Sequence, residues 1–431
     1  MRRQLAGLIL VLPLAVWADD KPLTLADALA AANEPHPQLD AAKADLDLAL
    51  AEQQLAISQG DLALSLDGAL RSGRPTTSPD EAGWASDNSI RLVARKTLFD
   101  FGRTAQTIAA ARSESSAREI NLLEVKDARR INIMARFFDV LLADMQDAAA
   151  SEYLAVAYTR WDDAKSRLEL GQISPSELSE LEAQYQDFRE RRNQAEQRVR
   201  ASRQKLADAL NRPGQLLRDL ESPRLPQNDR PLPDYEALLP VAMAENPTMR
   251  ALVAQIEGST LRADAVRRER GPTLDAELVG ADYSRAATTR DRASAGLVIN
   301  WPLYQGQRVD ARIALEQAQR DRLRARLAQI RLDLSEQLLD TLNEIEWLRT
   351  AARPAAATQA AYRDLALERA RAEYEMELKT NLGFAMADTQ AAAIRRQQVE
   401  FRLALALERL QALVGEPLEA IVARAKKERK S

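Results

Sequence analysis

Few residues in this sequence could carry catalytic chemistry. Its 431 residues include one histidine, His36, and no cysteine. His36 lies between two prolines, which predicts a turn residue at the start of a helix. Without cysteine there is no catalytic thiolate, and one histidine is too few for a common zinc site. A Ser-His-Asp triad would depend on His36, which we interpret as a turn residue. The gapped-glycine signatures of phosphate binding are also absent. We therefore expect no enzyme, and no catalytic, cofactor or metal site.

The charged residues are numerous but balanced. Charged side chains make up 29% of the chain, and the net charge of −4 becomes about −6 if Arg2 and Arg3 are removed. This balance disfavours nucleic acid as a partner, because nucleic-acid binding requires a basic face. The arginines of residues 189–203 are interleaved with Glu and Gln, which indicates a solvated helix face. The abundance of Ala, Glu, Leu, Arg and Gln is typical of long helices and coiled coils.

The first residues have the features of an export signal. Arg2 and Arg3 precede an apolar run from Leu5 to Val16, and small residues end the segment at Ala18. An uncleaved membrane anchor would require about 20 apolar residues, and Asp19 ends the run before that length. We expect a signal peptide at residues 1–18 and, without cysteine, no lipid attachment. The mature chain is then periplasmic or outer-membrane.

Two very long helical hairpins dominate the rest. Residues 103–169 contain neither proline nor glycine, so a helix there would approach 100 Å at about 1.5 Å per residue. It should reverse at residues 171–175 and return to about residue 211. The second long helix should begin near residue 306. Its apolar residues recur every three or four positions, as expected for one buried stripe: Leu323, Leu327, Ile330, Leu334, Leu338, Leu342 and Ile345.

The second hairpin has two expected irregularities. Pro354 should kink or split its first helix, because proline removes a helical hydrogen bond. The reversal near residues 376–383 has weaker turn chemistry than the first, and a returning helix is expected at 382–414. Two shorter helices, about residues 38–60 and 248–270, precede the strands described next.

Four segments of about ten residues alternate between apolar and polar side chains. They lie at about 62–72, 88–98, 272–284 and 293–303. Ten residues is the length with which a tilted strand crosses a bilayer, although a half-buried strand of a soluble sheet alternates equally well. Four aromatic residues favour the membrane, because they cluster where strands become helices, as in an interfacial girdle: Phe99, Phe101, Trp301 and Tyr304.

Four strands cannot close a membrane barrel alone. In hydrocarbon every backbone polar group must be paired, so an open sheet edge is excluded. Two chains would supply eight strands, and three would supply twelve, enough for a lumen. If these segments span a membrane, the protein must be a homo-oligomer.

The chain also repeats itself. LFDFGRTAQTIAAA from Leu98 aligns with LYQGQRVDARIALE from Leu303, and the order of strands and hairpin recurs around both segments. The expected organisation is a signal peptide (1–18), a first repeat (19–213, hairpin about 102–211), a linker (214–231), a second repeat (232–415, hairpin about 306–414) and a charged C-terminal tail (416–431).

This duplicated plan resembles the TolC family of outer-membrane efflux and secretion channels. The resemblance rests on the two strand exits and on the tip segments GQISPSELSELEAQ from Gly171 and MELKTNLGFAMADTQ from Met376. It implies a mainly α fold with a small β part: coiled-coil hairpins forming an α-barrel, and four transmembrane strands per chain in a trimeric twelve-stranded β-barrel. The implied partners are a periplasmic adaptor (membrane fusion protein), an inner-membrane RND or ABC transporter, and outer-membrane lipid.

The resemblance also suggests functional residues. Asp388 is the nearest match to an acidic residue at the family's periplasmic constriction, and Glu182 holds the related place in the first half. Three copies of one carboxylate around an axis would concentrate cations, although a solvated helix carboxylate explains either residue equally simply. The candidate adaptor-contact tips are Gly171, Gln172, Ile173, Ser174, Glu375 and Met376.

Two departures from the family pattern stand out. Thr97 lies where the second half has Pro302, and Glu375 or Met376 lies where the first tip has Gly171. Two other classes also remain open, a periplasmic coiled-coil adaptor and a structural protein of an envelope-spanning transport complex. The cargo, whether a drug, a metal ion or a polypeptide, is not encoded in any residue pattern.

Overall fold

The computed structural model describes residues 22–74, 84–215, 219–285, 290–376 and 381–428. The expected signal peptide therefore lies outside the described residues. The chain divides into two compact units. Unit 1 comprises residues 1–32, 133–225 and 370–394, and unit 2 comprises residues 33–132, 226–369 and 395–431. Each unit takes segments from both predicted repeats, so the compact units do not coincide with the sequence repeats.

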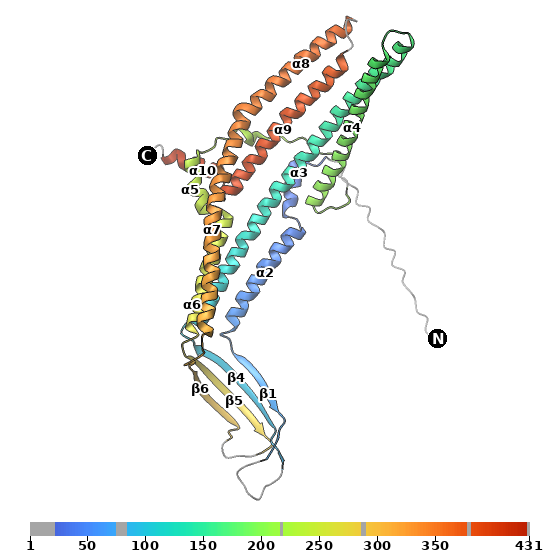
Figure 1. Ribbon diagram of the computed structural model, residues 1–431. Helices are drawn as coiled ribbons and strands as arrows, with labels where there is room; N and C mark the ends of the chain where they lie inside the picture. The colour runs from blue at the N-terminus through green and yellow to red at the C-terminus, as the bar shows by residue number, and fades with distance from the viewer. Residues whose placement is uncertain (1–21, 75–83, 216–218, 286–289, 377–380, 429–431) are drawn as a thin grey trace, which may run out of the picture. The chain divides into compact units, whose positions relative to one another are not determined.

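Unit 2 contains an antiparallel sheet with the strand order β1-β4-β5-β6 (Figure 1). The strands are β1 (Ala63–Ala69), β4 (Ser89–Phe99), β5 (Thr273–Tyr283) and β6 (Ala293–Asn300), with a short pair β2 (Ser72–Gly73) and β3 (Ala85–Ser86) beside them. β1, β5 and β6 lie within their expected segments, and β4 extends one residue beyond its segment; the short pair was not expected. Pairing of β4 with β5 joins the two halves of the sequence in one sheet.

The exit from β4 is fixed by a local cap. The Asp100 carboxylate accepts hydrogen bonds from the backbone N–H groups of Gly102 at 3.0 Å and Thr104 at 2.8 Å, which satisfies the first donors of the next helix. Phe101 and Gly306, which align in the sequence repeat, both have left-handed backbones, with φ of 55° and 61°. The two strand exits therefore share one left-handed position. They differ at the next residue, where Gly102 has φ of 81° and Gln307 has φ of −89°.

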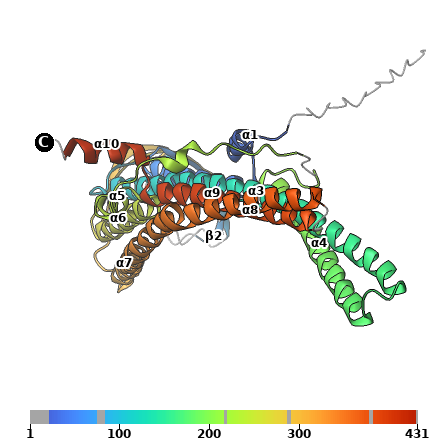
Figure 2. The same ribbon diagram turned by 90° about the horizontal axis from the view of Figure 1, so that it is seen from above.

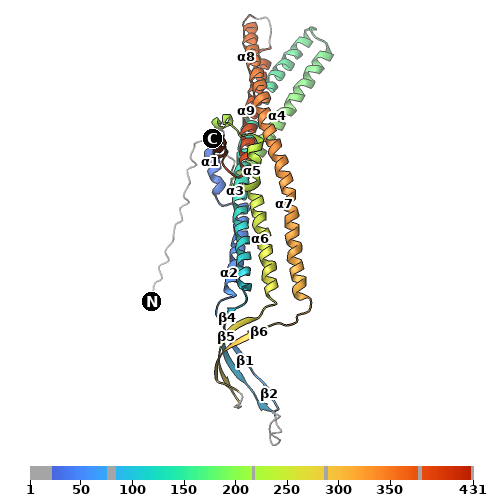
Figure 3. The ribbon, with the colours of Figure 1, turned by 90° about the vertical axis from the view of Figure 1, so that its left-hand side faces the viewer.

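Four helices of unit 2 each have one end next to the sheet. They are α2 (Pro37–Ser58), the first part of α3 (Arg103–Glu169), α6 (Pro247–Arg268) and α7 (Arg308–Trp347). Of these, α2 and α6 end at the sheet, and α3 and α7 begin there; α6 and α7 lie side by side (Figure 3). His36 caps α2, since its Nδ1 accepts a hydrogen bond from the Gln38 N–H at 3.2 Å. The expected turn role of His36 is confirmed.

The expected apolar stripe lies in the core of unit 2. Five of its residues on α7 are buried and two are partly buried. They pack against α5 (Tyr235–Glu245), α6, the second part of α9 (Leu382–Val414) and α10 (Leu418–Glu428). The expected C-terminal tail therefore includes a helix, on which the apolar residues Leu418 and Ile421, three residues apart, enter this core. The linker contains a 3-10 turn, η2 (Pro226–Asp229).

The long helix of the second half is interrupted as expected near Pro354. A π-helical segment, η3 (Leu348–Ala352), separates α7 from α8 (Arg353–Glu375). Because Pro354 has no N–H for the carbonyl four residues before it, the preceding turn widens instead of continuing as a regular α-helix.

Unit 1 contains the tip of the first hairpin and the part of the second near its reversal. The end of α3 turns back into α4 (Pro175–Ala209), and the two helices pack side by side (Figure 2). A short helix, α1 (Leu25–Ala30), followed by a 3-10 turn, η1 (Ala31–Asn33), precedes α2. Of the expected second reversal at 376–383, residues 377–380 lie outside the described residues.

Candidate functional site

The sheet has one apolar face, which is exposed in the single chain. Paired residues on neighbouring strands point to the same side, and the register aligns Leu64 with Ala94, Ala94 with Leu278 and Leu278 with Ala295. Leu92 and Leu297 lie two residues along the same face. Leu64, Leu92, Leu278 and Leu297 are 65%, 48%, 59% and 66% exposed. A contiguous group of leucines this exposed indicates a non-aqueous surrounding or a partner.

The opposite face is polar and carries ion pairs between strands. The Arg95 guanidinium donates to the Glu277 carboxylate at 2.5 and 3.0 Å, Arg91 pairs with Asp67 at 3.4 Å, and the Thr97 hydroxyl donates to Asp275 at 2.7 Å. Sequence alternation predicted a polar face, but it did not predict these pairs. Only the strand register decides which charges are neighbours.

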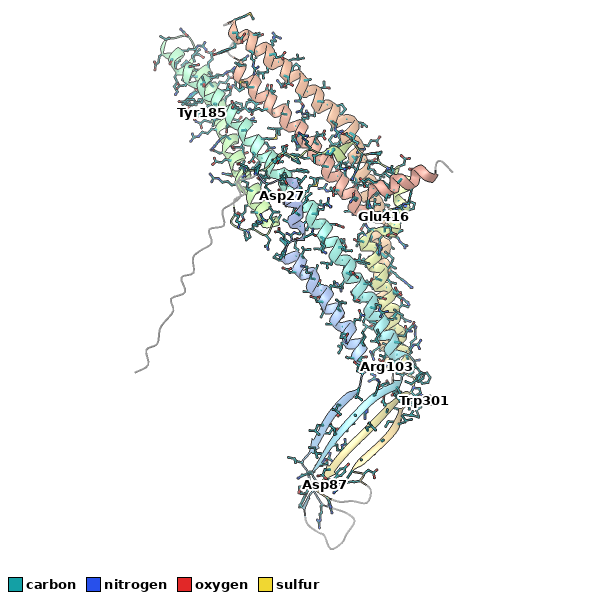
Figure 4. The ribbon with its side chains drawn as sticks, turned by 180° about the vertical axis from the view of Figure 1, so that it is seen from behind. Asp27, Asp87, Arg103, Tyr185, Trp301 and Glu416 are labelled. Carbon is teal, nitrogen blue, oxygen red and sulfur yellow. The ribbon has the colours of Figure 1, made fainter. Side chains whose placement is uncertain are left out.

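The four predicted interface aromatics surround one end of the sheet. The rings of Phe99 and Phe101 lie edge to face with centroids 4.7 Å apart. The Trp301 indole donates to the carbonyl of Arg270 at 3.2 Å, and Tyr304 is 91% exposed. Figure 4 places Trp301 at the helical end of the strands and Asp87 at the opposite end. The aromatics thus mark one end of the apolar face.

The first hairpin tip is a well-formed turn. Gly171 has φ of 67°, a conformation that favours glycine. Ser174 and Glu177 form a reciprocal capping box: Glu177 N–H donates to the Ser174 hydroxyl at 3.2 Å, and Ser174 N–H donates to the Glu177 carboxylate at 2.7 Å. These bonds from Ser174 lower the pKa of Glu177. Gln172 is exposed and Ile173 is half-buried.

The second tip shares only part of this chemistry. Glu375 ends α8, and Met376 is 60% exposed just after it. The turn that follows these two residues lies outside the described residues. The two tips therefore differ already at the residues that enter them.

The two candidate gate carboxylates have different surroundings within unit 1. Glu182 is exposed on α4. Asp388 on α9 is half-buried, and its carboxylate accepts a hydrogen bond from the Tyr153 hydroxyl of α3 at 2.5 Å. Since Tyr153 and Asp388 are 235 residues apart, sequence reasoning could not pair them. The pairing favours Asp388 over Glu182 as a carboxylate with a defined position.

An aromatic cluster holds this part of α3 against its neighbours. Tyr153 stacks on Phe188 of α4 with centroids 5.4 Å apart, and Phe384 of α9 lies 6.2 Å from Tyr153. The Arg160 guanidinium lies 4.3 Å from the Phe384 centroid and also hydrogen-bonds Asn381, and burial lowers its pKa. Sequence analysis missed this cluster, because its members come from three helices without a shared motif.

Among the described residues, no helix combines the length and the apolarity needed to cross a membrane. The described side chains also include no group of three or more His, Cys, Asp or Glu residues arranged to hold a metal ion.

Comparison with known proteins agrees with this architecture. Residues 238–416 match the family model described as outer membrane efflux protein. The Campylobacter jejuni CmeC outer membrane channel superposes with a TM-score of 0.76 at 14% identity, over 94% of this chain and 89% of that chain. No curated protein sequence matches the chain.

Two further channels have the same fold. The outer membrane protein VceC of Vibrio cholerae gives a TM-score of 0.72 at 17% identity, over 91% of this chain and 96% of that chain. The open state of the Neisseria gonorrhoeae MtrE outer membrane channel gives 0.71 at 17% identity, over 91% and 89%. The second half of the chain therefore matches the outer membrane efflux protein family model, and the chain has the fold of these outer membrane channels.

Proposed function

We propose that three copies of this chain form the exit duct of a tripartite efflux or secretion system. In this arrangement the sheets of three chains make a twelve-stranded barrel in the outer membrane, and the helical hairpins continue it into the periplasm. The observation that carries the proposal is the amphipathic sheet: one face is exposed and apolar, and the other carries ion pairs.

The sheet edges support assembly from several copies. Within the described residues, β1 pairs only with β4, and β6 pairs only with β5. An open edge in hydrocarbon would leave backbone N–H and C=O groups unpaired, which costs several kcal/mol per group. Pairing of β6 with β1 of the next copy would satisfy these groups at every junction. Twelve strands then leave a lumen lined by the polar face.

The helical tips are the proposed contact for a periplasmic adaptor, which would link the duct to an inner-membrane RND or ABC transporter. Gly171 to Ser174 present a rigid, capped loop, while Glu375 and Met376 present a charged and an apolar side chain.

Fractionation of cells that express the full-length chain tests the proposal. We expect the protein in the outer-membrane fraction, separated from an inner-membrane marker by density. Recovery in the soluble periplasm would contradict the duct and favour a coiled-coil adaptor or a structural protein. A chain with Leu64, Leu92 and Leu278 replaced by Ser is the matched control, since it keeps the strand pattern but removes the apolar face, and it should leave the membrane fraction.

A further inference from the structure

One cation interrupts the apolar face of the sheet. Lys96 on β4 lies on the same face of the strand as Leu92 and Ala94. The register places it opposite Ala276 of β5. Its neighbour Arg95 points to the polar face, where it pairs with Glu277. Lys96 is exposed, and among the described side chains it has no carboxylate partner. Where this face meets lipid, such a lysine would favour an anionic partner at the membrane interface.

The position of Lys96 along the strand indicates which leaflet could supply that partner. Phe99 follows three residues later, about 10 Å along a strand, at the end where the helices begin. At the other end of the face the next charge is Asp282, which pairs with Ile90. Only Ile, Leu, Ala and Gly occupy the paired positions between these two charges. Lys96 can therefore direct its amine along the sheet toward the aromatic end.

The face next to Lys96 is hollowed. Small residues on three strands, Ala94, Gly280, Ala293 and Ala295, form a shallow groove of about 480 Å³ together with Leu64, Leu92 and Leu278. The groove starts one row from Lys96 and runs away from the aromatic end. A groove of this shape and polarity suits an acyl chain, and the amine beside it suits the phosphate of the same lipid.

We propose that Lys96 and this groove bind one anionic phospholipid of the periplasmic leaflet, with its phosphate on the lysine amine and an acyl chain in the groove. The proposal rests on the proposed function, because it requires the apolar face to meet lipid. Because β4 is an interior strand, its neighbours on this face come from its own chain. Each copy in an assembled ring would therefore carry a complete site.

Native mass spectrometry of the detergent-solubilised full-length protein, titrated with phosphatidylglycerol or phosphatidylcholine, tests the site. We expect Lys96→Met to weaken phosphatidylglycerol binding about fivefold, the effect of one lysine at an anionic surface, with a smaller effect on phosphatidylcholine. Lys96→Arg should retain the preference. Gly280→Leu should weaken the binding of both lipids, because the leucine side chain would occupy the groove. A β-carbon at this position meets no protein atom within 4 Å.

Arg95→Met is the matched control, since it removes the same charge from the adjacent residue on the opposite face. Equal losses in Lys96→Met and Arg95→Met would overturn the site and indicate a net-charge effect. Equal binding of both lipids by the unaltered protein would also overturn it. Failure of the proposed function is distinguishable, because it would appear as protein absent from the outer membrane rather than as membrane-inserted protein without lipid preference.

Discussion

A single step along β4 changes the environment of a side chain completely. Leu92 pairs with Leu66 on the apolar face, whereas Val93 pairs with Ser65 and Val279 on the face that carries the ion pairs. Both residues are aliphatic, so composition does not distinguish them. Their roles follow only from the period of two along a strand.

This difference gives a matched pair of variants. Leu92→Arg should reduce assembled channel far more than Val93→Arg, because a lipid-facing arginine near mid-membrane costs roughly 2–4 kcal/mol and a lumen-facing one much less. The yield of protein in the outer-membrane fraction measures the effect. Equal yields for the two variants would mean that the sheet belongs to a soluble protein.

At the proposed gate, Asp388 is the residue to test. Asp388→Asn should weaken cation preference and block by multivalent cations in planar-bilayer conductance, since it removes one negative charge per chain from a narrow ring. Tyr153→Phe is the companion variant: it removes the hydrogen-bond donor to Asp388 and keeps the charge, so cation preference should persist. If Glu182→Gln changes selectivity and Asp388→Asn does not, the gate carboxylate is Glu182 of the first repeat.

At the scale of elements, the start of α4 should respond to pH. The folded state lowers the pKa of Glu177 through its bonds with Ser174. The capping contribution is therefore fully present above the usual glutamate pKa, and it is lost as the pH falls through the lowered value. Hydrogen exchange of the first turn of α4 should accelerate over that window. Glu177→Gln should remove this pH dependence, and an unchanged profile in the variant would contradict the cap.

The contact between α3 and α9 depends on a glycine. A β-carbon at Gly383 would collide with the side chain of Val156, which is β-branched and cannot rotate away easily. Gly383→Ala should therefore destabilise this contact by about 1–3 kcal/mol. Protease sensitivity of the hairpin tips reports the loss. The double variant with Val156→Ala should restore resistance, and additive losses instead would show that the two positions do not meet.

At the scale of the whole molecule, the edges of the sheet predict the assembly. The mass of detergent-solubilised particles should correspond to three chains, and mild detergent should not dissociate them, because separation would expose both β1 and β6. A monodisperse monomer with an intact sheet would contradict the trimer and the duct together. A dimer would contradict only the proposed lumen, because the interior of an eight-stranded barrel is filled by its own side chains.

The sequence determined the features of this protein that depend on local periodicity. Alternation identified the four strands, spacing by three and four identified the stripe that contains Leu338, and proline chemistry located the interruption before Pro354. Each of these follows from residues within a few positions of one another, so a linear reading is sufficient. The family resemblance then supplied the fold as a whole.

Only the tertiary structure decided which distant residues meet. Arg95 and Glu277, 182 residues apart, become partners because β4 and β5 pair in one particular register. A shift of one strand by one residue would place the two side chains on opposite faces of the sheet. Tyr153 and Asp388 meet because two helices pack side by side, and the groove beside Lys96 exists because small residues from three strands coincide. Periodicity fixes the direction of each side chain, whereas its neighbours depend on long-range packing that no local pattern encodes.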